Sequence, residues 1–274
     1  MKYLIIVVEF IFCFFSLKAQ NNIAYSVKYK YEWQKNPKEK KSTYTDIMVL
    51  DISKDSTNYF SYLRQIGLKN SKADIEAKRS MEYIQQNPAR YNADSESEII
   101  SFNNKKKSYR FTDKLTYGGT EYFYNENVDL PIWTIYGDSL KVLNFNCQKA
   151  TTSFKGRNYI AWFTSEIPIS SGPWLFRGLP GLILKINDTE NQFTFTCLEL
   201  KNSGFIEFAN YKFCKSVKKE ELKKLKKLKA TDLDAYDKML YPGLTITTTS
   251  SDGAVVSTPK RKIKPYNPID ISDK

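Results

Sequence analysis

Apolar and polar side chains alternate strictly along residues 23–33, IAYSVKYKYEW. The odd positions carry Ile, Tyr, Val or Trp, and the even positions carry Ala, Ser, Lys or Glu. A period of two is typical of a half-buried β-strand, and β-branched and aromatic residues favour one. The charged residues 34–41 then predict a hairpin loop, and residues 44–53 and 57–64 predict a second and a third strand.

Further apolar-polar alternation predicts β-strands over much of the remaining chain. Strands are expected at residues 98–102, 108–114, 120–126, 147–156, 158–165, 182–188 and 192–200, with an extended segment at 130–133 and a turn at 138–139. The period changes twice. Residues 71–87 predict a helix that Ser71 caps and Pro88 ends, and residues 216–241 predict a second helix that Ser216 caps.

The second predicted helix carries Leu222, Leu225 and Leu228 on one side and lysines over the rest of its surface. This pattern fits a surface helix that docks a narrow leucine stripe on the domain. An amphipathic helix on an anionic membrane is the alternative interpretation. Many antiparallel strands with one or two packed helices predict an α+β protein built on a large antiparallel sheet, which either curls over its core or leaves a concave face open.

The first residues, MKYLIIVVEFIFCFFSLKAQ, predict a signal peptide over residues 1–19, with cleavage after Ala19 or Gln20. Their apolar run is too short to cross a bilayer, so no transmembrane span is expected in the mature chain. We expect a single domain over residues 20–244. Residues 245–274 are basic, contain prolines and offer few large apolar side chains, which predicts a mobile tail. The protein is therefore expected in the periplasm, at the outer-membrane surface or in the medium.

The chain of 274 residues has 41% hydrophobic residues, a formal charge of +12 and no histidine. The charge is compatible with anionic lipid surfaces or acidic glycans, and nucleic acid is not expected as a partner of an exported protein. Without histidine, the Ser-His-Asp and Cys-His nucleophile arrangements and His-ligated zinc are excluded. We expect no metal and no cofactor. Cys147, Cys197 and Cys214 remain after export and predict one disulfide or none.

Glycine, proline and large aromatic residues concentrate in residues 172–183, GPWLFRGLPGLI. Proline removes a donor and glycine reaches φ > 0, so Gly172-Pro173 and Pro180-Gly181 each suit a chain reversal, with Gly181 in the left-handed position of a type I or II turn. Trp174 and Phe176 lie two residues apart and are expected to insert together beneath these turns. The stretch predicts a hydrophobic corner that sets strand register, and the rim of a ligand cavity is the alternative.

This segment resembles the GLPGLI family of exported Gram-negative bacterial proteins. The resemblance covers roughly residues 147–188. Its matching positions are Cys147, Lys149-Ala150, Phe154, Gly156-Arg157, Ala161-Trp162, Glu166-Ile167-Pro168, Gly172-Pro173 and the hexapeptide Gly178–Ile183. Phe163 is a departure, since such proteins more often carry Tyr there. The resemblance implies an exported protein of uncharacterised activity and a bowl-shaped, lipoprotein-carrier-like half-barrel, and it supplies no catalytic residues.

The binding candidates are Arg157, Trp162, Glu166, Trp174, Phe176 and Arg177. A pair between Arg157 and Glu166 across a hairpin is one hypothesis, with a structural ion pair at the sheet edge as the simpler interpretation. No catalytic residue is assigned, because nothing in the spacing of Glu166 and Asp188 requires two carboxylates to face each other. The leading hypothesis is a non-catalytic protein whose sheet binds an apolar or amphipathic ligand, with lipid, peptide or an outer-membrane protein as partner. A structural or assembly protein with a filled core and a carboxylate-based hydrolase are the alternatives.

Overall fold

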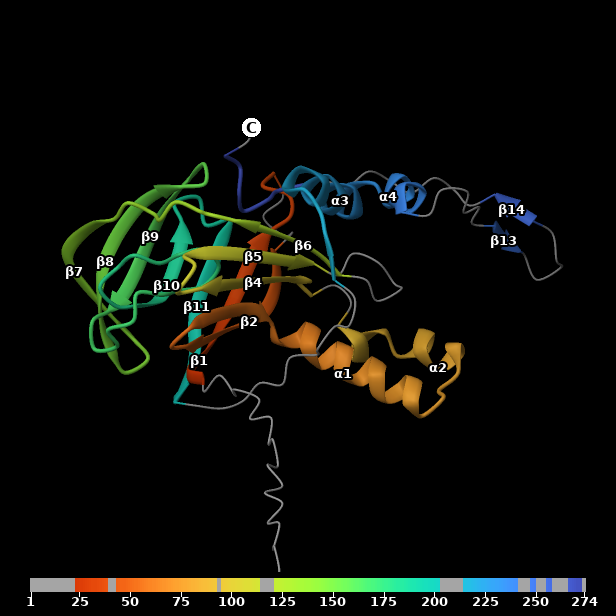
Figure 1. The fold of residues 1–274 in the computed structure, drawn as a ribbon, viewed down its shortest axis with the longest axis horizontal. Helices are drawn as coiled ribbons and strands as arrows, with labels where there is room; N and C mark the ends of the chain where they lie inside the picture. The colour runs from red at the N-terminus through yellow and green to blue at the C-terminus, as the bar shows by residue number, and fades with distance from the viewer. Residues whose placement is uncertain are drawn as a thin grey trace, which may run out of the picture.

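The computed structural model describes residues 23–38, 43–92, 95–113, 121–202, 214–240, 247–249, 255–257 and 266–272. Twelve strands form one sheet in the order β12-β6-β5-β4-β3-β2-β1-β11-β10-β9-β8-β7 (Figure 1). Neighbouring strands are antiparallel except β12, which runs parallel to β6. The prediction of a large antiparallel sheet with few helices is confirmed. In Figure 1, β8 to β10 run steeply whereas β4 and β5 run across the view.

The strands of this sheet are β1 (Ile23–Gln34), β2 (Thr43–Ser53), β3 (Ser56–Ser61), β4 (Glu98–Asn103), β5 (Ser108–Asp113), β6 (Glu121–Glu126), β7 (Thr134–Val142), β8 (Phe145–Phe154), β9 (Arg157–Thr164), β10 (Leu182–Asp188), β11 (Phe193–Asn202) and β12 (Cys214–Ser216). The helices are α1 (Tyr62–Glu76), α2 (Met81–Gln86), the 3₁₀ helix η1 (Pro88–Tyr91), α3 (Lys219–Thr231) and α4 (Leu233–Leu240). A separate two-stranded sheet pairs β13 (Thr247–Thr249) with β14 (Val255–Ser257).

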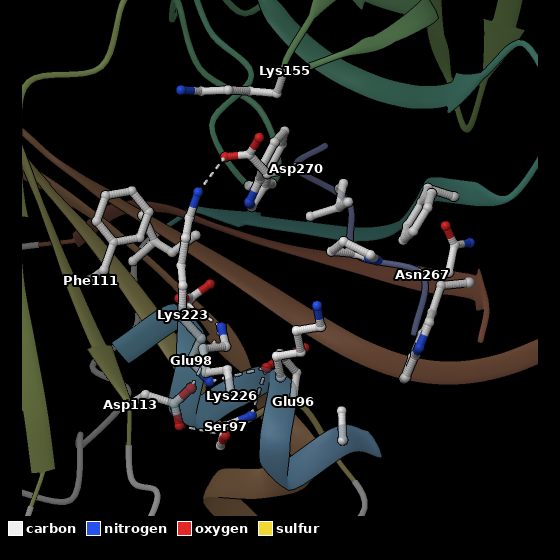
Figure 2. Close-up of a pocket in the computed structure, with 18 of the residues that line it drawn as sticks. Glu96, Ser97, Glu98, Phe111, Asp113, Lys155, Lys223, Lys226, Asn267 and Asp270 are labelled. Atoms are coloured by element: carbon white, nitrogen blue, oxygen red, sulfur yellow. Dashed lines mark hydrogen bonds and ion pairs between the residues drawn. The ribbon is translucent and has the colours of Figure 1, made fainter. Parts of the chain in front are cut away.

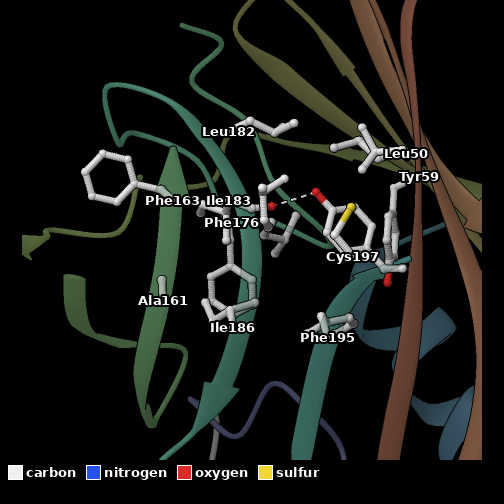
Figure 3. Packing of buried hydrophobic residues seen from close by; sticks show 14 of the residues in the cluster. Leu50, Tyr59, Ala161, Phe163, Phe176, Leu182, Ile183, Ile186, Phe195 and Cys197 are labelled. Carbon is white, nitrogen blue, oxygen red and sulfur yellow. Dashed lines mark hydrogen bonds between the residues drawn. The ribbon is translucent and has the colours of Figure 1, made fainter. Parts of the chain in front are cut away.

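The core lies on one face of the sheet and is continuous from β5 to β8. Val27, Tyr29 and Tyr31 of β1 are buried in it, as the alternation predicts. The Tyr29 hydroxyl donates to the Ile183 carbonyl across the intervening strand β11, at 2.7 Å. Figure 3 shows this bond among the packed side chains of β10 and β11. A buried carbonyl is thereby satisfied where the strand ladder is interrupted.

That interruption is a β-bulge between Ile183 and Lys185, where β10 pairs with β9. Simple alternation predicts Leu182 and Leu184 on one face and Ile183 on the other. Instead all three side chains are fully buried and belong to the same core. A bulge adds one residue to one strand and shifts its register, which explains the break in the pattern.

The first helix begins earlier than the sequence indicated. Ser61, at the end of β3, caps α1 by accepting a bond from the Arg64 N–H, so residues 62–64, which were predicted as strand, are helical. Ser71 lies inside α1, and Ser80 caps the short helix α2. The Ser61 hydroxyl also donates to the buried Asp46 carboxylate at 2.9 Å, a contact between β2 and the helix start that no local pattern reveals.

The basic segment forms two helices, and Ser216 ends β12 instead of capping α3. Leu222 and Leu225 are buried against Tyr122 and Tyr124 of β6, together with Tyr236 of α4. Docking of the leucine stripe on the domain is therefore confirmed. No helix in the described part of the chain is both long and apolar enough to span a bilayer. The predicted signal peptide lies outside the described residues.

Candidate ligand-binding cavity

A cavity of about 940 Å³ lies between the core face of the sheet, helix α3 and residues 266–271 (Figure 2). Strands β1 to β6 and β11 form its floor. The aromatic side chains that line it are Tyr31, Trp33, Tyr44, Tyr59, Phe111, Tyr124, Trp174, Phe193, Phe195 and Tyr266. Cavities of this volume and apolar character commonly hold small organic ligands in proteins.

The floor contains two aromatic stacks. The Tyr31 ring stacks on Trp33 with centroids 4.7 Å apart and on Phe195 at 4.5 Å with an interplanar angle of 3°. Phe111 stacks on Tyr124 at 4.8 Å. These rings come from four strands and provide flat apolar surface, whose removal from water by a ligand is favourable.

Among the described residues, eight lysines and five carboxylates also line the cavity. Three of these carboxylates, Glu98, Asp113 and Glu126, lie on the floor strands β4, β5 and β6. Three lysines on one side of α3 form ion pairs with the sheet and the C-terminal segment: Lys219 with Glu126, Lys223 with Asp270, and Lys226 with Glu98 and Asp113. The cavity is thus amphipathic, with aromatic rings on its floor strands and ion pairs where α3 meets the sheet and the C-terminal segment.

Glu98 and Asp113 lie directly opposite each other on β4 and β5. Lys226 bridges them, at 2.9 Å from Glu98 and 3.6 Å from Asp113, and Ser97 donates to Asp113 at 2.6 Å. Burial raises the pKa of Glu98, and Lys226 partly offsets this. Burial alone lowers the pKa of Lys226, but the two carboxylates outweigh it and raise that pKa well above its usual value. The ion pairs of this cluster, in which two carboxylates share one ammonium group, hold α3 on the sheet.

Residues 266–272, which we name the C-terminal strap, close one side of the cavity. Arg157 holds the strap with bonds to the Asn267 side chain at 2.7 Å, the Pro268 carbonyl at 3.0 Å and the Ile269 carbonyl at 3.2 Å. The Ile271 N–H donates to the Lys155 carbonyl at 3.0 Å. This part of the predicted mobile tail therefore makes ordered contacts, and mobility of the other tail residues stays a prediction.

Arg157 itself is buried, with a side chain that is 7% exposed. It forms an ion pair with Asp188 at 3.4 Å, and its guanidinium lies over the Phe193 ring at 4.5 Å. The hypothesis that Arg157 pairs with Glu166 is wrong, because the two residues lie at opposite ends of β9. Glu166 instead accepts a bond from the Asn146 N–H at the turn between β7 and β8. Asp188 is the last residue of β10, and its partner on the neighbouring strand β9 is Tyr159, near the start of that strand. Asp188 therefore does not lie beside Glu166 either.

The Gly-Pro segment packs two rings as the corner interpretation predicted. Phe176 is 1% exposed and lies edge-on to Trp174 at 5.2 Å and to Tyr159 at 4.7 Å. Trp174 is half-buried and also lines the cavity, and the centre of its ring lies 5.9 Å from that of Phe154. Phe176 is thus a core residue, and Trp174 serves both the corner and the cavity rim.

The glycines of the hexapeptide have roles different from the predicted ones. Gly178 is the residue with a left-handed backbone, at φ +103°. Gly181 has no positive φ, but a Cβ there would lie 2.1 Å from the Thr164 carbonyl oxygen. It is needed because the chain passes so close to the end of β9. Leu179, Leu182 and Ile183 are buried, so the hexapeptide is part of the core.

Two further predicted candidates lie away from the cavity. Arg177 places its guanidinium over the Phe102 ring of β4 at 3.7 Å, and its carbonyl accepts from the Trp133 indole at 2.9 Å. Trp162 is half-buried in the middle of β9 and is not among the residues that line the cavity. Of the six candidates, Trp174 alone lines the cavity among the described residues, and Arg157 acts indirectly by holding the strap.

Sequence reasoning did not predict that the aromatic floor and the ion-paired lysines of α3 form one site. The available signals were the aromatic alternation of β1 and the lysines of α3, which were interpreted as core and solvated surface. Within the described residues, the three cysteines are free thiols, and no group of three His, Cys, Asp or Glu side chains is arranged to hold a metal. Burial raises the pKa of the Cys147 thiol to about 11 and that of Cys197 to about 12.

Residues 152–185 match the model of a family described as "Protein of unknown function (Porph_ging)". The match contains the hexapeptide, so the resemblance to the GLPGLI family is confirmed over this segment. A comparison with curated proteins found no match.

Two solved structures of PNGF-II are similar at 15% identity. The one in space group C2 has a TM-score of 0.50 and covers 82% of this chain and 34% of that chain. The one in space group P21 has a TM-score of 0.49, with coverages of 73% and 32%. This chain therefore spans about a third of the PNGF-II chains, and at this identity the likeness shows the fold alone.

Proposed function

We propose that this chain, which carries the GLPGLI-family segment, is an exported non-catalytic protein that binds an apolar or amphipathic ligand in the cavity beneath α3. The observation that carries the proposal is the cavity of about 940 Å³ with an aromatic floor. A filled core would favour a structural or assembly protein, and the open volume argues for the binding function instead.

A carboxylate-based hydrolase has less support. Glu166 caps a turn, and Asp188 is 2% exposed and bonded to Arg157 and to the Phe193 N–H. Glu98 and Asp113 do line the cavity, but both are engaged in ion pairs with Lys226. A general acid and base need carboxylates that reach a substrate and exchange protons near neutral pH.

Binding of the neutral fluorescent probe N-phenyl-1-naphthylamine tests the proposal. Trp174→Leu removes a ring from the cavity wall, and Trp162→Leu removes a half-buried ring elsewhere in the same sheet as a matched control. We expect the wild-type protein to bind the probe. Loss of about 60 Å² of apolar contact at about 25 cal/mol per Å² weakens binding about tenfold in the Trp174 variant. The Trp162 variant should bind as the wild type does.

Absence of probe binding, or an equal effect of the two substitutions, would overturn the proposal. Thermal unfolding of both variants, followed by circular dichroism, shows whether each remains folded. Export is tested separately by N-terminal sequencing of the protein recovered from the periplasm or medium, where we expect a start after Ala19 or Gln20. Recovery with Met1 intact would contradict export through a cleaved signal.

A further inference from the structure

Lysine side chains from two distant parts of the chain lie at one end of the cavity. Lys155 and Lys223 both line it there, with Asp270 of the strap as their carboxylate (Figure 2). Asp270 lies 3.7 Å from the Lys223 amino group, and these side chains are 20% and 36% exposed. In the described part of the chain Lys155 has no ion pair, and its amino group lies 5.8 Å from the centre of the Phe154 ring.

The position of Lys155 is set by the fold. Lys155 and Gly156 form the two-residue turn between β8 and β9, with φ of +50° and +81°. Two consecutive positive φ angles are the signature of a type I′ hairpin, which fixes the direction of the turn. Phe154, next to Lys155, contacts Trp174 on the cavity wall. A positive group and an apolar ring are therefore neighbours at this end.

At the opposite end carboxylates gather around Lys226. Lys226 contacts Glu98 and Asp113, and Figure 2 shows this cluster away from Lys155. An anion would meet three carboxylates there, since Glu96 also lines that end. Three carboxylates thus gather at the Lys226 end, whereas Lys155 has no ion pair within the described residues, so the Lys155 end suits an anion better.

We propose that the ligand is an amphipathic organic anion. Its apolar body lies on the aromatic floor beside Trp174, and its carboxylate, phosphate or sulfonate group lies between Lys155 and Lys223. This inference rests on the proposed binding function and specifies the ligand class. Charge-assisted bonds from two ammonium groups hold the anion, and the half-buried site screens them less than open solvent does.

Asp270 competes with the ligand in this arrangement. Its Oδ1 atom accepts from the Ser272 N–H at 3.0 Å and from the Ser272 hydroxyl at 2.6 Å, and its Oδ2 atom faces Lys223. A bound anion replaces Asp270 Oδ2 as the negative partner of the Lys223 amino group. Removing the negative charge of Asp270 should therefore strengthen anion binding, whereas removing the positive charge of Lys155 should weaken it.

Two probes with one ring system separate charge from apolar contact. 1-Anilinonaphthalene-8-sulfonate and N-phenyl-1-naphthylamine share one ring skeleton. The first carries an additional negatively charged sulfonate, and the second is uncharged. We expect Lys155→Gln to weaken binding of the sulfonate probe about tenfold and Asp270→Asn to strengthen it about threefold, given the usual contribution of a charge-assisted hydrogen bond. Neither substitution should change binding of the neutral probe. Lys106→Gln, on the turn between β4 and β5 outside the cavity, is the matched charge control.

The outcomes distinguish this inference from the proposed function. If neither probe binds the wild-type protein, the proposed function fails and this inference falls with it. If the neutral probe binds but the Lys155 and Lys106 variants affect the sulfonate probe equally, the anion site is refuted and the binding function stands. Displacement of the sulfonate probe by dodecanoate or by dodecyl phosphate identifies the preferred anion, and equal displacement by uncharged dodecanol would contradict an anion site.

Discussion

Arg157→Met tests whether the buried guanidinium fastens the strap to the sheet. The substitution keeps an unbranched apolar chain of similar length. It removes the ion pair of Arg157 with Asp188 and the hydrogen bonds that Arg157 donates to residues 267–269. Asp188 is 2% exposed and keeps its bond from the Phe193 N–H at 2.9 Å. A buried carboxylate thus loses the cation beside it.

Breaking a buried ion pair from one side costs about 3–5 kcal/mol, mostly because the remaining charge stays desolvated. Burial raises the pKa of Asp188, and the Phe193 N–H and Arg157 lower it in part. A carboxyl group with a raised pKa in the folded state destabilises the protein while ionised, and protonation at lower pH relieves this cost. Without Arg157 the pKa of Asp188 rises further, so the deficit of the variant shrinks as pH falls from 7 to about 4.

Urea unfolding followed by circular dichroism measures the effect. With a slope of about 3 kcal/mol per molar, a loss of about 4 kcal/mol lowers the midpoint by about 1.3 M at pH 7. Arg157→Met combined with Asp188→Asn leaves no buried charge and should regain part of this loss. A midpoint within about 0.3 M of wild type, or a deficit that grows as pH falls, would refute the role given to Arg157.

Three further substitutions follow from the packing. Gly181→Ala places a Cβ 2.1 Å from the Thr164 carbonyl oxygen and should destabilise the protein by more than about 3 kcal/mol, whereas Gly137→Ala, with no atom within 4 Å, should stay within about 0.5 kcal/mol in the same urea assay. Leu225→Ala should cost about 2–4 kcal/mol by leaving a cavity beneath α3, and a smaller loss than an exposed-site control would show that α3 is not docked. Burial raises the pKa of Asp51 to about 6, so its ionisation should lower wild-type stability as pH rises from about 4 to 7, and Asp51→Asn should remove that component from a pH series of unfolding curves.

Local patterns predicted most of the strands because alternation reports directly which face of a strand is buried. Val27, Tyr29 and Tyr31 illustrate this, since each follows the period of two and each is buried. The turn predicted at residues 138–139 is wrong, since both residues lie inside β7. The start of α1 was missed because Tyr59, Phe60 and Tyr62 continue a run of aromatic residues that favours a strand. Ser61 caps the helix through the Arg64 N–H and is itself held by a bond to Asp46, fifteen positions away.

The site was harder to predict because it is made by contacts between distant segments. Arg157 binds Asn267, which is 110 residues away, and Lys226 of α3 reaches Glu98 and Asp113 of the sheet. No spacing within a local window encodes such pairs. The role of Gly181 shows the same limit, since the need for glycine comes from the carbonyl of Thr164 and not from the turn itself.

The four tryptophan indoles of the protein provide the most direct test of ligand binding in the cavity. Trp33 and Trp174 line it, whereas Trp133 and Trp162 are not among its lining residues. In a ¹⁵N-¹H spectrum of the indole groups, titration with N-phenyl-1-naphthylamine should shift the signals of Trp33 and Trp174 and leave those of Trp133 and Trp162 in place. Saturation with no shift at Trp33 and Trp174, or shifts confined to Trp133 and Trp162, would contradict a ligand site beneath α3.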